Sequence, residues 1–270
     1  MVMQGLLRRP DWRIFEFAMT VYHRKMSDTL LVSVTAVVFL GALTRMTFGF
    51  GEAVITMPLL TLLPLPWRTT VALMGLVGLT VACVAIIAGR RHIDWRILWP
   101  LALSALVGIP MGLLMMRVVP EPLMIGILGA LLIAYGIASL ARKRDYPVHW
   151  ASRWSLLFGF VSGALGSAYN LNGIPIAVYG TLSDWPPDTF RSTLQGYFLV
   201  SGALIVSAQG LSGLWSRQMF TLYGLSLPAI AAAILVGRQL HRHLSTAKFQ
   251  RALYILIAGL GALLITRALG

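Results

Sequence analysis

The 270 residues are 57% hydrophobic and 11% charged, whereas soluble domains carry about 25% charged residues. This composition excludes an ordinary soluble domain and predicts a polytopic membrane protein. The 22 basic and 9 acidic residues give a formal charge of +13. The basic residues lie in short connections between apolar runs, as in cytoplasmic loops, so nucleic acid is not an expected partner.

The apolar runs predict an all-α chain of eight hydrophobic segments. Residues 1–27 form a basic arm, which is either amphipathic and bound to a membrane surface or a disordered tail. The first run begins at Thr29 and must continue to Phe48-Gly49 to be long enough to span a bilayer, with 53–63 as its second arm. A second broken segment is expected at 154–183. The remaining predicted spans are 69–89, 97–116, 122–141, 192–212, 218–237 and 252–266.

The segment 154–183 has no charged side chain, yet it is rich in helix breakers and amides. These residues are Gly163, Gly166, Asn170, Asn172, Gly173 and Pro175. Glycine and proline disfavour one continuous helix, and an unpaired amide at membrane depth is costly. A kinked helix with glycines for close packing is one interpretation. We favour a broken helix or re-entrant hairpin whose irregular backbone lines a cavity. If both broken segments are helix pairs, the chain has ten helices.

An earlier stretch resembles this one. T-R-M-T-F-G-F-G-E-A-V-I-T-M-P, from Thr44 to Pro58, also joins two apolar runs through close glycines and ends in proline. Downstream, W-R-T-T from Trp67 parallels F-R-S-T from Phe190. The chain therefore divides into two diverged repeats, 28–141 and 154–270, joined by a cytoplasmic linker, 142–153. Interrupted segments at matching places in two halves indicate a transport site.

The basic loops predict a topology. Loops 89–96, 142–153 and 237–251 are rich in basic residues and are expected to be cytoplasmic. The repeat then puts matching loops on opposite sides, so the halves are inverted and each broken segment enters and leaves on one side. The basic N-terminal arm does not fit this arrangement, and the side of the N-terminus stays open.

These motifs resemble the TauE/SafE family, the sulfite-exporter-like permeases. The resemblance rests on G-F-G-E-A-V-I-T-M-P-L-L, the second copy G-A-L-G-S-A-Y-N-L-N-G-I-P-I and F-R-S-T, and it spans about residues 28–268. It implies a multi-pass inner-membrane transporter of small sulfur-containing anions such as sulfite or organosulfonates, with export commoner than import. The family usually has a run of glycines where this chain has Gly51-Glu52-Ala53.

A non-transport membrane protein, either an intramembrane enzyme or a scaffold subunit, is the alternative function. The sequence has no nucleophile elbow, paired carboxylates, zinc spacing or phosphate-binding loop. No catalytic residue, metal ligand or cofactor is therefore expected. The expected partners are a small anion, the lipid bilayer and protons as a candidate coupling ion, and a homo-oligomer is left open.

The candidate substrate-binding residues surround the two breaks. A half-helix that begins after Gly51 or Gly173 would point free N–H groups and its positive dipole end into the membrane. Arg45 would attract an anion while Glu52 tunes it or exchanges a proton, or the two form a structural ion pair. Arg191 would steer anions at the cavity mouth or serve as an interfacial anchor. The full set is Arg45, Gly49, Gly51, Glu52, Thr56, Gly166, Asn170, Asn172, Gly173, Arg191 and Gln195.

Overall fold

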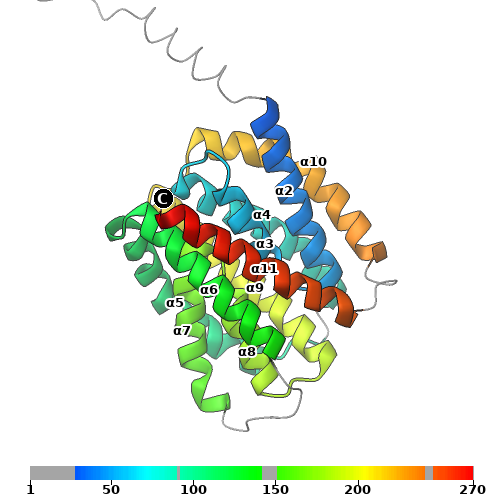
Figure 1. Cartoon of the computed structure of the whole chain (residues 1–270). Helices are drawn as coiled ribbons and strands as arrows, with labels where there is room; N and C mark the ends of the chain where they lie inside the picture. The colour runs from blue at the N-terminus through cyan, green and yellow to red at the C-terminus, as the bar shows by residue number, and fades with distance from the viewer. Residues whose placement is uncertain (1–27, 90–91, 142–150, 241–245, 270) are drawn as a thin grey trace, which may run out of the picture.

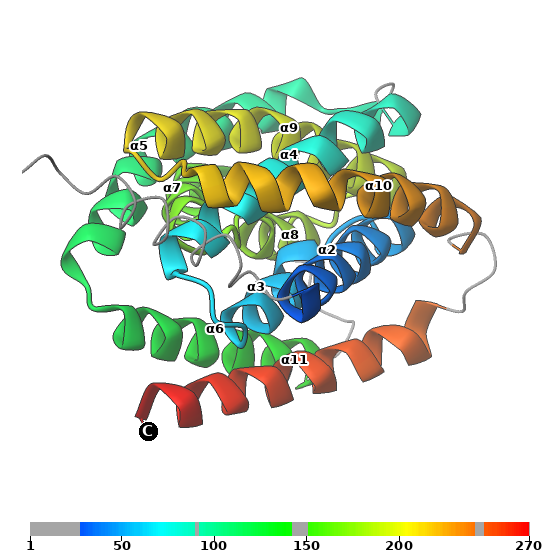
Figure 2. The same ribbon diagram turned by 90° about the horizontal axis from the view of Figure 1, so that it is seen from above.

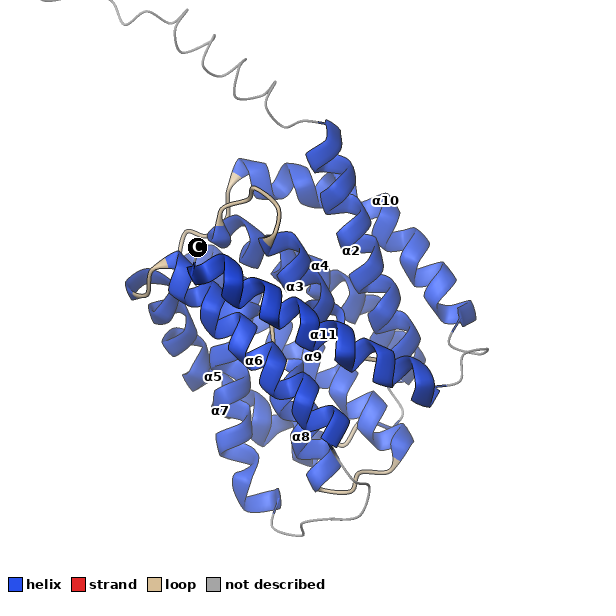
Figure 3. Ribbon diagram, in the orientation of Figure 1, coloured by secondary structure: helices blue, strands red, loops and turns tan. Residues whose placement is uncertain are grey.

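The structure is a computed structural model that describes residues 28–89, 92–141, 151–240 and 246–269. These residues form ten helices and no strand (Figure 3), so the all-α prediction is confirmed. The arm 1–27 and most of the linker 142–153 lie outside the described residues. The helices are α2 (Asp28–Phe48), α3 (Glu52–Thr61), α4 (Trp67–Gly89), α5 (Trp95–Val118), α6 (Glu121–Ala141), α7 (Ala151–Tyr169), α8 (Gly173–Leu182), α9 (Pro187–Leu211), α10 (Arg217–Leu240) and α11 (Thr246–Leu269).

Six helices in the described ranges are long and apolar enough to cross a membrane. They are α2, α4, α5, α6, α9 and α10. Side chains such as Leu103, Val107 and Leu235 are exposed on the outside of the helix bundle. Water would not tolerate this many exposed apolar groups on a soluble protein, whereas lipid tails would cover them. The apolar exterior and the hydrophobic composition therefore both fit a protein that is surrounded by lipid.

Helices α2 and α3 form a hairpin around two left-handed glycines. Gly49 and Gly51 have φ of +87° and +91°, a region that favours glycine because it has no Cβ. The turn folds α3 back along α2, so that a side chain added at Gly41 of α2 would collide with the Thr56 hydroxyl of α3. The first expected break therefore lies at residues 49–51, where the sequence placed it.

Helices α7 and α8 form a second hairpin within the expected segment, but not all of the expected helix breakers make its break. Gly163 and Gly166 do not interrupt α7; a side chain at Gly163 would overlap the Ala105 carbonyl of α5. These glycines serve close helix packing. The helix instead ends at Tyr169, where Asn170 has a φ of 56°. Asparagine tolerates this left-handed region better than most residues because its short amide hydrogen-bonds locally.

The two hairpins are held in a bundle of paired helices. α5 packs along α7, α2 along α10, α4 along α9 and α6 along α11. α6 and α11 lie side by side as an outer layer (Figures 1 and 2), with α5 and α10 on the opposite side of the bundle. The short helix α3 contacts α4, α6 and α11. The first turns of the two short helices therefore lie inside the bundle.

Candidate anion site

A cavity lies where the first turns of α3 and α8 meet α4 and α9. The cavity has a volume of about 60 Å³, measured as the space open to the centre of a water-sized sphere. One water needs about 10–15 Å³ on this measure, so a small polyatomic anion fits. The wall consists of Arg45, residues 50–54, Met74, Gly75, Gly78, Leu79, residues 170–174, Phe198, Gly202, Ile205 and Val206.

Arg45 projects from the last turn of α2 into this cavity and is 5% exposed. Its Nη1 donates to Glu52 Oε2 at 2.8 Å and to the Gly78 carbonyl at 2.9 Å. Its Nη2 donates to Gln195 Oε1 at 3.3 Å. The guanidinium also lies over the Phe198 ring, 4.4 Å from the centroid, a favourable cation–π geometry. Arg45 is thus fixed by contacts with three other helices.

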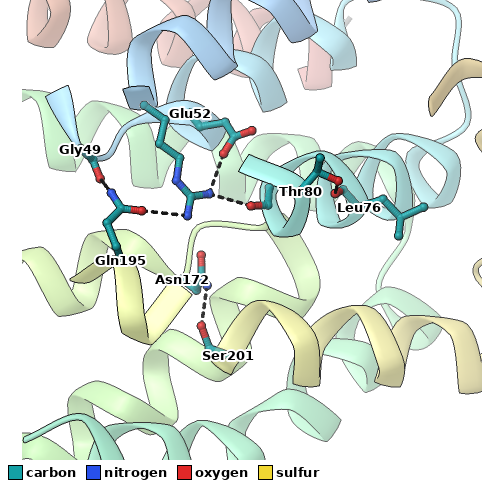
Figure 4. Close-up of polar contacts among 9 residues, drawn as sticks. Gly49, Glu52, Leu76, Thr80, Asn172, Gln195 and Ser201 are labelled. Atoms are coloured by element: carbon teal, nitrogen blue, oxygen red, sulfur yellow. Dashed lines mark hydrogen bonds and ion pairs between the residues drawn. The ribbon is translucent and has the colours of Figure 1, made fainter. Parts of the chain in front are cut away.

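Gln195 of α9 links Arg45 to the bend between α2 and α3 through two hydrogen bonds. Its Oε1 accepts from Arg45, and its Nε2 donates to the carbonyl of Gly49 (Figure 4). One amide therefore holds both the guanidinium and the bend between α2 and α3. Gln195 is buried but does not line the cavity wall, so the structure places it behind the site. Arg191, one turn earlier, packs against Gly49 and also lies outside the wall.

Two polar atoms on the wall have no partner within the described part of the chain. They are Nε of Arg45 and Oε1 of Glu52. Each unmade hydrogen bond in a buried site costs free energy, and the ion pair itself is only half satisfied because Glu52 uses a single oxygen. Arg45 thus retains a buried donor, Nε, from which no described residue accepts a hydrogen bond.

The N-termini of both short helices also meet this cavity. Gly51 precedes α3 and Asn172 precedes α8, and neither caps its helix with a side chain. In α3 the N–H groups of the first turn have no acceptor within the helix. In α8, Pro175 has no N–H, so this helix contributes mainly Gly173 and the positive end of its dipole to the cavity. The site thus combines a guanidinium with two positive helix ends.

The Asn172 amide is used elsewhere, which explains the uncapped α8. Its Nδ2 donates to Ser201 Oγ at 2.9 Å (Figure 4). The backbone carbonyl of Asn172 accepts from Ser162 Oγ at 2.6 Å. Ser162 in turn accepts from the Tyr197 hydroxyl at 2.7 Å. This hydroxyl network fixes the backbone at the start of α8 against α7 and α9.

The other predicted residues are divided between the wall and its supports. Asn170 lines the cavity, and its amide donates to the Val71 carbonyl at 2.7 Å. Gly166 lies behind the wall, where a side chain would press on Asn172 and Ile205. Thr56 does not reach the cavity, because its hydroxyl faces Gly41. Of the eleven predicted residues, six lie on the wall: Arg45, Gly51, Glu52, Asn170, Asn172 and Gly173.

Sequence reasoning missed the contribution of α4 and most of that of α9. Gly75 and Gly78 bring the α4 backbone close, and the Gly78 carbonyl accepts from Arg45. Phe198 supplies the ring beneath the guanidinium. In an apolar run these residues look the same as lipid-facing ones. The only signal was the pair of small residues three apart, which indicates a close helix contact but not what it contacts.

No group of three or more His, Cys, Asp or Glu side chains able to hold a metal occurs within the described ranges. The arrangement offers hydrogen-bond donors and positive charge instead. Such a site suits an oxyanion, whose oxygens accept from a guanidinium and from backbone N–H groups.

Comparison with known proteins gives an independent result. The family model described as "Sulfite exporter TauE/SafE" matches residues 34–264. A protein of Cupriavidus necator named "Probable sulfite/organosulfonate exporter TauE" is 23% identical over 243 residues, which cover 88% of this chain and 95% of that protein. No solved structure matches the chain significantly. The matched region includes the breaks of both hairpins and every residue of the cavity wall.

Proposed function

Because the chain belongs to the TauE/SafE sulfite exporter family, we propose that it is a secondary transporter that exports a small sulfur-containing anion, such as sulfite or an organosulfonate, across the cell inner membrane. The family is one of multi-pass transporters and not of enzymes, so the intramembrane-enzyme alternative loses its basis. The name of the Cupriavidus protein supports the substrate class.

One observation carries the proposed binding site: a buried guanidinium edge and two helix N-termini converge on one cavity. Arg45 lines the cavity, and residues 51–54 and 172–174 contribute the helix ends. A sulfonate or sulfite head has three oxygens on one sulfur. These oxygens could bind the Arg45 edge, the α3 amides and Gly173 together, which is how a small oxyanion is held without many cationic side chains.

We further propose that the two halves are inverted repeats, α2–α6 and α7–α11, whose hairpins are re-entrant. Helix contacts support this. Exchanging the halves turns the α5–α7 pair into the α10–α2 pair, and it maps the α4–α9 and α6–α11 pairs onto themselves. Each hairpin turns back inside the bundle at the cavity. Alternating access would then come from rocking one repeat against the other around the fixed site.

The driving force would be a gradient. An anion that leaves a cell with a negative interior is helped by about 2.3 kcal/mol per charge per 100 mV. Exchange of a proton at Glu52 is the alternative coupling. Flux of sulfite from liposomes under an imposed potential separates them, because potential-driven flux persists in Glu52→Gln and proton-coupled flux does not.

The test of the proposed function is sulfite binding and flux with the purified protein in detergent and in liposomes. Arg45→Gln should abolish both, because it removes the donors and the positive charge at the cavity. The matched control is Arg117→Gln, which removes an exposed arginine from the end of α5 and should leave both unchanged. A folded Arg45→Gln protein with normal sulfite flux would refute the proposed site.

A further inference from the structure

We propose that Glu52 restricts this transporter to monoanions, so that doubly charged oxyanions of the same size are rejected; this inference deepens the proposed anion site and rests on it. Glu52 is the first residue of α3 and is 4% exposed. One of its carboxylate oxygens binds Arg45 Nη1 at 2.8 Å, and the other, Oε1, has no partner among the residues described. The carboxylate is therefore on the wall beside the place where an anion would bind.

A charge count leads to this inference. Within the described chain, Arg45 and Glu52 are the charged side chains that line the cavity. Their formal charges cancel. The remaining positive charge comes from the N-termini of α3 and α8, about +0.5 each. The cavity thus balances about one negative charge, and a second negative charge would stay uncompensated in a buried site, next to a carboxylate.

The geometry allows the ligand and Glu52 to be present together. Nη1 of Arg45 donates to Glu52 and to the Gly78 carbonyl, which accounts for both of its hydrogens. Nε is unused and Nη2 makes one bond, to Gln195. Because Glu52 binds Nη1 alone, a ligand oxygen that reaches Nη2 or the buried Nε would not displace it. The carboxylate then stays beside the bound ligand, and its negative charge acts on the ligand directly.

Neighbouring groups do not cancel this effect. Gly75 and Gly78 place backbone rather than charge on the α4 side of the cavity. On the α9 side, the wall consists of Phe198, Gly202, Ile205 and Val206. Arg191 packs against Gly49, outside the wall. A lining with so few polar groups has a low effective dielectric constant, in which one unbalanced charge weighs heavily.

Methanesulfonate and sulfate form a matched pair of probes. They have the same number of non-hydrogen atoms and a similar tetrahedral shape, but methanesulfonate is a monoanion and sulfate a dianion near neutral pH. Binding of each should be measured by titration calorimetry on the purified wild-type protein, on Glu52→Gln and on Glu121→Gln. The last variant removes an exposed carboxylate from the start of α6 and controls for overall charge.

The wild-type protein should bind methanesulfonate at least about 30-fold more tightly than sulfate, because the buried second charge has no counter-charge. Glu52→Gln should reduce this preference at least about tenfold, chiefly by tighter sulfate binding, because the amide has nearly the same shape as the carboxylate and carries no charge. Glu121→Gln should keep the wild-type preference.

Equal binding of the two probes by the wild-type protein would overturn the inference without any variant, so an unstable Glu52→Gln protein cannot rescue it. An unchanged preference in a folded Glu52→Gln protein would overturn it as well, while methanesulfonate binding would leave the proposed function standing. Binding of neither probe by the wild-type protein would overturn the anion site, and the inference with it.

Discussion

Replacing Arg45 by methionine tests how strongly the cavity depends on its ion pair. Arg45 and Glu52 are 5% and 4% exposed, and their side chains meet at 2.8 Å. Removing one partner of a buried pair leaves an uncompensated charge and costs about 3–5 kcal/mol, whereas replacing both by apolar groups is often neutral. We therefore expect Arg45→Met to be strongly destabilised and Arg45→Met/Glu52→Met to recover most of the loss.

The measurement is a thermal-unfolding cycle on the wild-type, two single-variant and double-variant proteins in detergent. At about 2–4 °C per kcal/mol, Arg45→Met should unfold roughly 10 °C below the wild type, with the double variant within a few degrees of it. Sulfite should stabilise the wild type and have a smaller effect on the double variant, which keeps the helix ends but lacks the guanidinium. Additive single effects would show that the two charges do not stabilise each other, and would refute the reasoning.

Three further predictions concern the supports of the site. Gly108→Ala should cost about 1–3 kcal/mol of stability because the new Cβ overlaps the Phe160 carbonyl of α7. Gly224→Ala should be neutral or stabilising by up to about 1 kcal/mol, because the new Cβ meets no neighbouring helix within 4 Å. Thermal unfolding compares the two variants. Asn170→Gly should cost about 1 kcal/mol for the lost bond to Val71, and Asn170→Leu about 1–2 kcal/mol more for its left-handed backbone; equal unfolding temperatures would contradict this. Ser201→Ala should weaken sulfite binding about fivefold because Asn172 loses its acceptor, with Thr221→Ala, which removes an exposed hydroxyl from α10, as the unchanged control in the same titration.

The sequence was sufficient to predict the helices because each one is an apolar run bounded by charge, proline or glycine. The first break was also predictable, since two glycines in three residues, Gly49 and Gly51, adopt the left-handed region. The second break also falls within the expected segment, with α8 beginning at Gly173, but two of the glycines expected to disrupt the helix lie inside α7. Glycine either ends a helix or allows another helix to approach, and the sequence does not distinguish the two roles. Gly163 packs against α5, and the turn is made by Asn170.

The sequence predicted contacts between site residues that are near each other in the chain, but not contacts between helices that are far apart in sequence. Arg45 and Glu52 were visible as charges in an apolar region, and they are indeed paired. The bond between Arg45 and Gln195 joins residues 150 positions apart, and nothing local marks Phe198 or Gly78 as its other neighbours. Such contacts depend on how α4 and α9 cross, which is determined by the packing of the whole bundle.

A site made largely of helix ends separates affinity from selectivity. Backbone N–H groups and dipoles have the same charge in any sequence that folds this way, so they can attract anions without specifying which one. Selectivity must then come from the few side chains that change the charge or shape of the cavity. In this chain those are Arg45, its carboxylate partner Glu52 and the ring of Phe198. Since Arg45 is neutralised by its partner, the helix ends supply the net attraction. A single substitution at Glu52 should therefore change the charge of the anion that binds.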